Sequence, residues 1–240
     1  MIEKFQIFVQ LSRLNKPIGI LLLFWPCAWG LTLGHYFYEE TIIYLKYIIF
    51  FFLGSVLMRS AGCIVNDIVD KEFDKKVART KNRPLASKKI SVLESFVYVI
   101  LLCLIALIIL LQFNKLTIIL GMGSMLLAFT YPFMKRITYW PQLFLGLTFN
   151  WGVIMGWSSI SNNISLEPII LYLSAIFWTL GYDTIYGLQD MHDDEIIGVK
   201  STSIKFKNNV KVFVGCCYCL CILFILIMFL MLEMNKYLFT

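Results

Sequence analysis

Apolar residues gather along this chain in long, almost uninterrupted runs separated by polar segments. An α-helix of about 20 residues crosses a hydrocarbon layer ~30 Å thick, and seven runs approach or exceed that length. They are 18–38, 42–64, 91–112, 116–134, 142–161, 168–187 and 210–232. The pattern predicts an all-α, polytopic membrane helix bundle with about seven transmembrane helices. We expect a single membrane-embedded domain over residues 1–240.

The composition strengthens this prediction. Of the 240 residues, 59% are hydrophobic and 15% are charged, whereas soluble domains typically carry about 25% charged residues. The lipid bilayer is therefore the expected partner of much of the surface. The seven cysteines show no CxxC spacing, which argues against a metal–thiolate site. The N-terminal segment lacks signal-peptide and transit-peptide character, so we expect it to remain uncleaved.

Basic residues predict the orientation in the membrane. Most of the 21 Lys and Arg residues lie near the N-terminus or in the connections after the second, fourth and sixth runs. The positive-inside rule places these parts, including the polar loops 65–90 and 188–209, in the cytoplasm. An odd number of helices then places the C-terminus outside. This topology accounts for the net charge of +6 without a nucleic-acid partner, and it fits a bacterial inner membrane with an active site facing the cytoplasm.

Acidic residues concentrate at the predicted cytoplasmic ends of two helices, which is unusual on a basic face. The first acidic motif, residues 66–74, reads NDIVDKEFD. At about 100° per residue, Asn66, Asp70 and Asp74 share one helical stripe, with Asp67 on its flank. Arg59, seven residues before Asn66, joins this stripe. A charged side chain inside a membrane helix is costly, so Arg59 is expected to face a polar cavity.

The second acidic motif, residues 183–194, has the same placement at the end of a later helix. Asp183, Asp190 and Asp194 share one face of it. Clustered carboxylates repel one another unless a cation lies between them, and Mg²⁺ binds a few carboxylates together with substrate phosphates. Two such motifs can hold one diphosphate through Mg²⁺, with neighbouring Lys and Arg on the remaining phosphate oxygens. The alternative is that both motifs are ordinary solvated charges.

Several longer segments carry a family resemblance. They are NDIVDKEFD, TKNRPLAS, YDTIYGLQDMHDDEIIGVKSTSIKF, KPIGILLLFWPCAWGL and YPFMKRITYWPQLFLG. Together they resemble the UbiA superfamily of membrane prenyltransferases, and within it the branch that acts on 4-hydroxybenzoate. The resemblance implies a helical bundle whose central cavity opens to the cytoplasm and to lipid. It also implies nine helices, so two helices following the last predicted one are expected to be missing here.

The activity that the resemblance implies is Mg²⁺-dependent transfer of a polyprenyl group. The group passes from polyprenyl diphosphate to the ring carbon meta to the carboxylate of 4-hydroxybenzoate, an early membrane step of ubiquinone biosynthesis. The family's motifs imply that five residues hold the metal and diphosphate: Asn66, Asp70, Asp74, Asp190 and Asp194. We expect the four aspartates of this set, with the adjoining Asp67, to be the catalytic residues.

Candidate substrate-binding residues follow from the needs of this reaction. Lys200 and either Arg79 or Arg83 are candidates for the outer phosphate oxygens. Tyr131 and Tyr182 are candidates for shielding an allylic cation, because aromatic faces attract cations.

The acceptor's carboxylate calls for an arginine, whose guanidinium is planar and always charged. Arg59 and Arg136 are the candidates, with Arg13 as a third. The base that removes the ring proton is left open between an aspartate of either motif and the released diphosphate.

Two other classes of function remain as alternatives. A sister prenyltransferase would use a haem O, menaquinone or chlorophyll-type acceptor. A membrane cation transporter would place its ionisable residues near the bilayer midplane, whereas here the acids lie at helix ends and continue into loops. Prenyl chain length and oligomeric state are not predicted by the sequence.

Overall fold

The long apolar runs all form helices. The computed structural model describes residues 2–77 and 79–238, with side chains described for 3–77 and 79–232. Seven of its helices are long and apolar enough to cross a membrane, which confirms the predicted number. They are α2 (Ile18–Tyr38), α3 (Thr41–Val69), α5 (Val92–Leu110), α6 (Lys115–Ile137), α7 (Pro141–Ser161), α8 (Leu166–Gly187) and α11 (Val210–Leu238).

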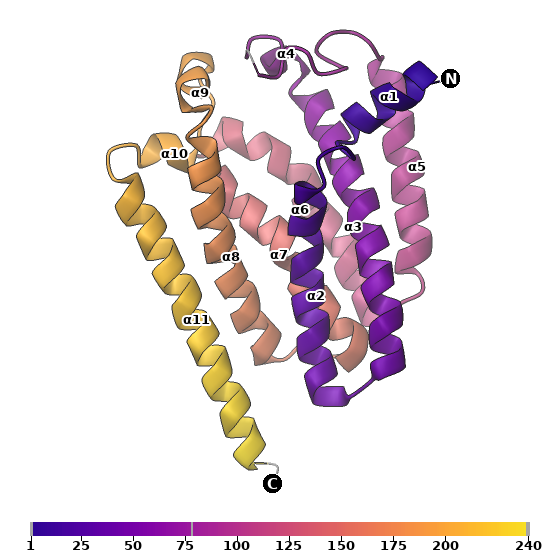
Figure 1. Ribbon diagram of the computed structural model, residues 1–240, viewed down its shortest axis with the longest axis vertical. Helices are drawn as coiled ribbons and strands as arrows, with labels where there is room; N and C mark the ends of the chain where they lie inside the picture. Colours follow the sequence, from indigo (N-terminus) through magenta and orange to yellow (C-terminus); the bar gives the residue numbers. More distant parts are fainter. Residues whose placement is uncertain (1, 78, 239–240) are drawn as a thin grey trace.

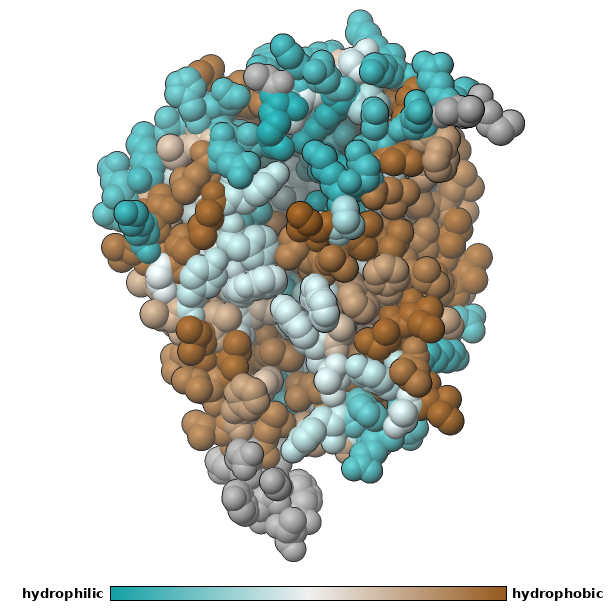
Figure 2. All heavy atoms as spheres, viewed as in Figure 1, coloured by the Kyte–Doolittle hydropathy of each residue, from teal (hydrophilic) through white to brown (hydrophobic). Residues whose placement is uncertain are grey.

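Four shorter helices gather at one end of the bundle. They are α1 (Ile2–Leu11), α4 (Lys71–Asp74), α9 (Met191–Ile197) and α10 (Thr202–Lys205). Figure 1 shows them at the end that carries the N-terminus, with the C-terminus at the opposite end. Hydrophilic residues cover this end in Figure 2, and hydrophobic residues cover most of the remaining height. Both acidic motifs therefore lie at one polar end of an apolar bundle.

Two of the long helices, α3 and α6, extend beyond the C-terminal ends that hydropathy predicts. α3 continues to Val69 instead of ending at 64, and α6 continues through Pro132 to Ile137 instead of ending at 134. Hydropathy detects the part of a helix that faces lipid, whereas backbone hydrogen bonds continue into the polar region. The extension of α3 matters because it brings Asn66 and Asp67 onto the helix itself.

Glycines allow α7 to approach α2 closely at the centre of the bundle. A Cβ atom on Gly30 would lie 1.9 Å from the carbonyl oxygen of Val153, and one on Gly156 would lie 2.2 Å from that of Cys27. Small residues at such crossings give membrane helices their close packing. Because α7 also packs against α6 and α8, it serves as the central wall beneath the polar end.

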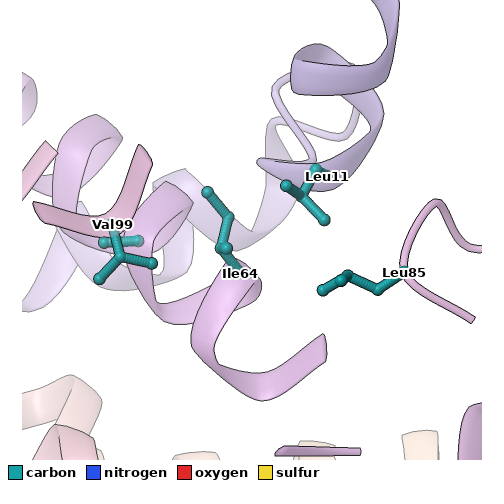
Figure 3. Close-up of a cluster of buried hydrophobic side chains, with 5 residues drawn as sticks. Leu11, Ile64, Leu85 and Val99 are labelled. Atoms are coloured by element: carbon teal, nitrogen blue, oxygen red, sulfur yellow. The ribbon is translucent and has the colours of Figure 1, made fainter. Parts of the chain in front are cut away.

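A buried apolar cluster fixes the connection that follows α4. Leu11 of α1, Ile64 of α3, Leu85 of the connection and Val99 of α5 meet there, each at most 5% exposed. Figure 3 shows these side chains converging from four separate segments. The cluster anchors the connection over the end of α3, next to the first acidic motif.

Candidate active site at the polar end

A polar cavity of about 240 Å³ opens at this end of the bundle. Its walls come from α3, α4, α6, α7, α8, α9 and their connections. Many of the residues singled out from the sequence line it: Asn66, Asp70, Asp74, Arg79, Arg83, Tyr131, Asp183, Asp190, Asp194 and Lys200. The structure thus brings the two acidic motifs, more than a hundred residues apart in sequence, to one cavity.

Helical backbone geometry keeps the first acidic motif on one side of the cavity. α3 ends at Val69, but the backbone N–H of Asp70 donates to the Asn66 carbonyl at 2.9 Å, and that of Asp74 donates to the Asp70 carbonyl at 2.8 Å. The four-residue spacing therefore survives the break between α3 and α4. The predicted stripe of Asn66, Asp70 and Asp74 is confirmed as a geometric feature.

Asp70 is the most enclosed acid on the cavity wall, with 2% of the residue exposed. Lys135 of α6 donates a hydrogen bond to its Oδ2. Its Oδ1 lies 3.5 Å from Nη2 of Arg136 and, in the described part of the chain, accepts no hydrogen bond. A buried carboxylate oxygen without a hydrogen bond is costly and favours binding a further cation.

Asp67 lies behind the cavity and does not line it. Its Oδ1 accepts from Nη2 of Arg13 at 2.6 Å and from Nη1 of Arg83 at 3.1 Å. Arg83 also donates to Asp74, at 2.8 and 3.0 Å. Burial would lower the pKa of Arg13, but the charges of Asp67 and Asp74 act against this, and the net shift is upward. Asp67 therefore joins two arginines that the apolar cluster already holds near it.

The second acidic motif pairs with an arginine from the connection that follows the first motif. Arg79, in the connection after α4, donates to Asp190 through Nε at 2.9 Å and through Nη2. The hydrogen bond and charge of Asp190 raise the pKa of Arg79 although burial opposes this. Burial, followed by the neighbouring charge of Asp190, raises the pKa of Asp194 to about 6. This motif is thus less fully neutralised by basic residues than the first.

The segment after α9 brings Lys200 to the cavity edge. The Lys200 backbone N–H donates to the Lys135 carbonyl at 2.8 Å, and its Nζ donates to the Ile137 carbonyl at 3.2 Å. A residue of α7 also fixes this segment, since the Thr202 N–H donates to Gln142 Oε1 at 3.0 Å. The Thr184 and Thr202 hydroxyls lie 2.7 Å apart.

Some predicted site residues lie outside the cavity lining. Arg59 lies deeper in the bundle, with its guanidinium 5.2 Å from the centre of the Phe149 ring. Arg136 donates to the Val69 carbonyl at 2.8 Å. Tyr182 packs edge-on against Trp178, with ring centres 4.8 Å apart. These three residues do not line the cavity, although Arg136 lies 3.5 Å from Asp70.

Among the cavity-lining residues that sequence reasoning missed are Lys135 and Gln142. Lys135 was interpreted only as a topology charge, although it follows Tyr131 by four residues and so shares a helical face with it. Gln142 had no comparable signal, because its importance comes from a backbone group sixty residues further along.

The donor atoms of the cavity suit Mg²⁺ in their chemistry. Carboxylate and amide oxygens are hard ligands of the kind this ion prefers, and the unsatisfied Oδ1 of Asp70 adds a buried acceptor. Among the described side chains of residues 3–77 and 79–232, however, no three of His, Cys, Asp or Glu lie close enough together to hold a metal ion. Lys135, Arg79 and Arg83 pair with the acids in this arrangement.

These features define a multi-pass membrane protein with a polar cavity, rich in carboxylates and basic side chains, at one end of its helices. The chain belongs to the UbiA prenyltransferase family, whose sequence pattern matches residues 23–240.

Two relatives illustrate the similarity in sequence. The mitochondrial 4-hydroxybenzoate polyprenyltransferase of Homo sapiens is 49% identical over 86% of this chain and 55% of its own length. The protein of the same name from Arabidopsis thaliana is 45% identical over 87% of this chain and 51% of its own length. The chain thus spans about half the length of these relatives.

Solved structures show the same fold. A UbiA homolog from Aeropyrum pernix K1 superposes with a TM-score of 0.73 at 24% identity, covering 85% of this chain and 76% of its own. A UbiA homolog from Archaeoglobus fulgidus bound to GPP and Mg²⁺ gives 0.71 at 19% identity, covering 94% and 78%.

Proposed function

We propose that this protein transfers a polyprenyl group from polyprenyl diphosphate to the ring of 4-hydroxybenzoate in an Mg²⁺-dependent reaction, an early membrane step of ubiquinone biosynthesis. The observation that carries the proposal is the convergence of both acidic motifs with Lys135, Arg79 and Arg83 on one cavity at a membrane face. The names of the relatives from Homo sapiens and Arabidopsis thaliana support the same reaction.

The diphosphate is proposed to bind among the basic side chains of the cavity. Arg79 and Arg83 present planar guanidinium groups, which suit bidentate contact with phosphate oxygens. Lys135 and Lys200 approach from the end of α6 and the segment after α9. Arg79, Arg83 and Lys135 each form an ion pair with an aspartate. A diphosphate therefore competes with these carboxylates for the same cations.

Asn66, Asp70, Asp74, Asp190 and Asp194 are the proposed metal-binding residues. When bound, Mg²⁺ would neutralise the negative charge that develops on the leaving diphosphate. In the structure, Asp70 pairs with Lys135 and Asp190 pairs with Arg79. Asp67, already satisfied by Arg13 and Arg83, is proposed to act by orienting Arg83.

Arg59 is the better candidate for the carboxylate of the acceptor. Among the described residues it makes no ion pair or hydrogen bond, whereas Arg136 is engaged by the Val69 carbonyl and by Asp70. Tyr131 lines the cavity, and the charges of both Arg59 and Asp70 act on it. Tyr131 and Tyr182 are the proposed aromatic groups that shield the allylic carbon from water.

We place the protein in a bacterial inner membrane with the cavity facing the cytoplasm. The basic polar end supports this orientation. The relatives from Homo sapiens and Arabidopsis thaliana are mitochondrial, so a mitochondrial membrane is the alternative location. Cell fractionation combined with labelling of single cysteines from either side distinguishes the two locations and orientations.

Reconstitution in lipid nanodiscs tests the activity. Purified protein supplied with 4-hydroxybenzoate, polyprenyl diphosphate and Mg²⁺ should form prenylated product, and a chelator should abolish it. Transfer only to another aromatic acceptor would contradict the proposed substrate. Cation flux in liposomes without any transfer would contradict the proposed reaction class.

A further inference from the structure

Asp183 is an acid of the cavity wall that neither the metal nor the diphosphate contacts proposed above employ. It lies on α8 four residues before Gly187, and so ~6 Å inside the polar end of that helix. Within the described part of the chain, its carboxylate makes no hydrogen bond or ion pair. Asp70, Asp74 and Asp190, by contrast, each contact a Lys or Arg.

Asp183 interacts electrostatically with three neighbouring side chains. The positive charge of Arg59 acts on Asp183, and the charge of Asp183 acts on Tyr131 and Tyr182. Arg59 lies ten residues before the end of α3, ~15 Å from that end by helical rise. Arg59 and Asp183 thus attract each other from different helices without forming an ion pair in the described structure.

This arrangement suits a ligand that carries an anion at one end and a hydrogen-bond donor at the other. Because Arg59 and Asp183 lie on different helices and do not form an ion pair with each other, the two ends of one aromatic ligand can contact them separately. A carboxylate directed at Arg59 would place the opposite edge of the ring nearer Asp183. A carboxylate without a hydrogen-bond donor gains most by accepting a proton or a hydrogen bond from such a ligand.

We propose that Asp183 is the base that removes the proton from the acceptor ring. This rests on the proposed function. The ring carbon next to the hydroxyl forms a bond to the allylic carbon of the prenyl group, and the bond from that carbon to the diphosphate oxygen breaks, with its electron pair leaving on diphosphate. The Asp183 carboxylate then takes the proton from the alkylated ring carbon, and the C–H electron pair restores the aromatic ring.

Position separates Asp183 from the other groups that could take this proton. Asp67 is enclosed by Arg13 and Arg83 and does not face the cavity. Asp190 contacts Arg79 nearer the polar end. Released diphosphate would remain among the basic groups at that end. Asp183, in contrast, lines the cavity, forms no ion pair with a basic side chain among the described residues, and interacts electrostatically with Arg59.

Isotopic labelling of the acceptor tests this role. We compare Asp183→Asn with the wild-type protein in nanodiscs, using ordinary 4-hydroxybenzoate and 4-hydroxybenzoate deuterated at both carbons next to the hydroxyl. The substitution should lower kcat about 10²- to 10⁴-fold, the usual contribution of a general base. The residual reaction should show a primary isotope effect that the wild type lacks, because proton removal has become slow. Asp183→Glu should recover part of the rate.

Matched controls separate this role from a structural one. Asp193→Asn makes the same chemical change outside the cavity lining and should leave both kcat and the isotope effect unchanged. Asp183→Asn should still bind a non-hydrolysable prenyl diphosphate analogue. A residual rate without an isotope effect, a kcat within threefold of wild type, loss of analogue binding, or no recovery in Asp183→Glu would each contradict the assignment. Failure of the proposed function shows differently, as absence of product from the wild-type protein.

Discussion

The two acidic motifs face the same cavity but differ in how the protein holds them. In the first, Asp67, Asp70 and Asp74 are each at most 7% exposed and each contacts basic side chains from other segments. In the second, α9 has no buried residue among those described, and Asp190 pairs with the half-exposed Arg79. We call the first motif the fixed wall of the cavity, because its acids are buried and paired. We call the second motif the adjustable wall, because its residues are more exposed.

This difference explains how a charged ligand can enter a site whose carboxylates and basic side chains already pair with one another. Breaking a buried ion pair leaves an uncompensated charge and is strongly unfavourable. The pair between Arg79 and Asp190 is partly solvated, with the arginine side chain 47% exposed, and exposed pairs contribute little. Ligand binding is therefore expected to open the cavity at Arg79 while Asp67 and its arginines stay in place.

Replacing Asp70 should have the largest effect on the fixed wall. Asp70→Ala removes the carboxylate that Lys135 and Arg136 share and deletes a proposed metal ligand. We expect transfer to fall by about 10³-fold or more, as for loss of a central electrostatic group. Excess Mg²⁺ should not restore it, because the site loses its anchoring group. Prenylation rates over a range of Mg²⁺ concentrations measure this.

The control for Asp70→Ala is Asp193→Ala, which removes an acid of the second motif that does not line the cavity. It should retain transfer at the wild-type level. Near-normal turnover in Asp70→Ala, with the protein folded in detergent, would contradict the proposed metal site.

Replacing Asp190 should affect the adjustable wall in a graded way. Asp190→Ala should lower transfer at ordinary Mg²⁺ by less than Asp70→Ala does, and high Mg²⁺ should restore part of it, since Asp194 remains. We expect the half-saturating Mg²⁺ concentration to rise by about 10- to 100-fold. If added Mg²⁺ rescues Asp70→Ala but not Asp190→Ala, the proposed contrast between the two walls is reversed.

The sequence predicted the fold more completely than the site. Length and hydropathy were sufficient to predict seven spans, because each helix must be long and apolar enough to cross a hydrocarbon layer ~30 Å thick. The helical repeat was sufficient to place Asn66, Asp70 and Asp74 on one face. The role of Asp67 could not be predicted, because helical phase does not reveal that Arg13 and Arg83, from two other segments, close on it. The pairing of Arg79 with Asp190 likewise depends on contacts across 111 residues.

Replacing Asp67 should destabilise the protein more than it impairs chemistry. Asp67→Asn keeps the shape of the side chain but leaves Arg13 and Arg83 without their buried anion. Loss of one partner of a buried pair is strongly destabilising, and the arginines here keep 25% and 21% exposure, so we expect about 2–3 kcal/mol. Unfolding by SDS titration in mixed micelles measures this. Turnover of the folded fraction should fall less than in Asp70→Ala.

An unchanged unfolding transition in Asp67→Asn would show that the network does not stabilise the fixed wall. A loss of turnover as large as that of Asp70→Ala, at unchanged stability, would instead assign Asp67 a direct part in the chemistry.

Replacing Glu195 should have the smallest effect and tests how little the adjustable wall depends on its surface charges. Glu195 accepts a hydrogen bond from Lys207 at 2.8 Å, with side chains 38% and 51% exposed. Exposed pairs contribute little, so Glu195→Gln should change stability by at most about 0.5 kcal/mol and leave turnover unchanged. The same SDS titration and prenylation assays measure both. A destabilisation comparable to that of Asp67→Asn would mean that α9 is held as firmly as the first motif, and the difference between the two walls would disappear.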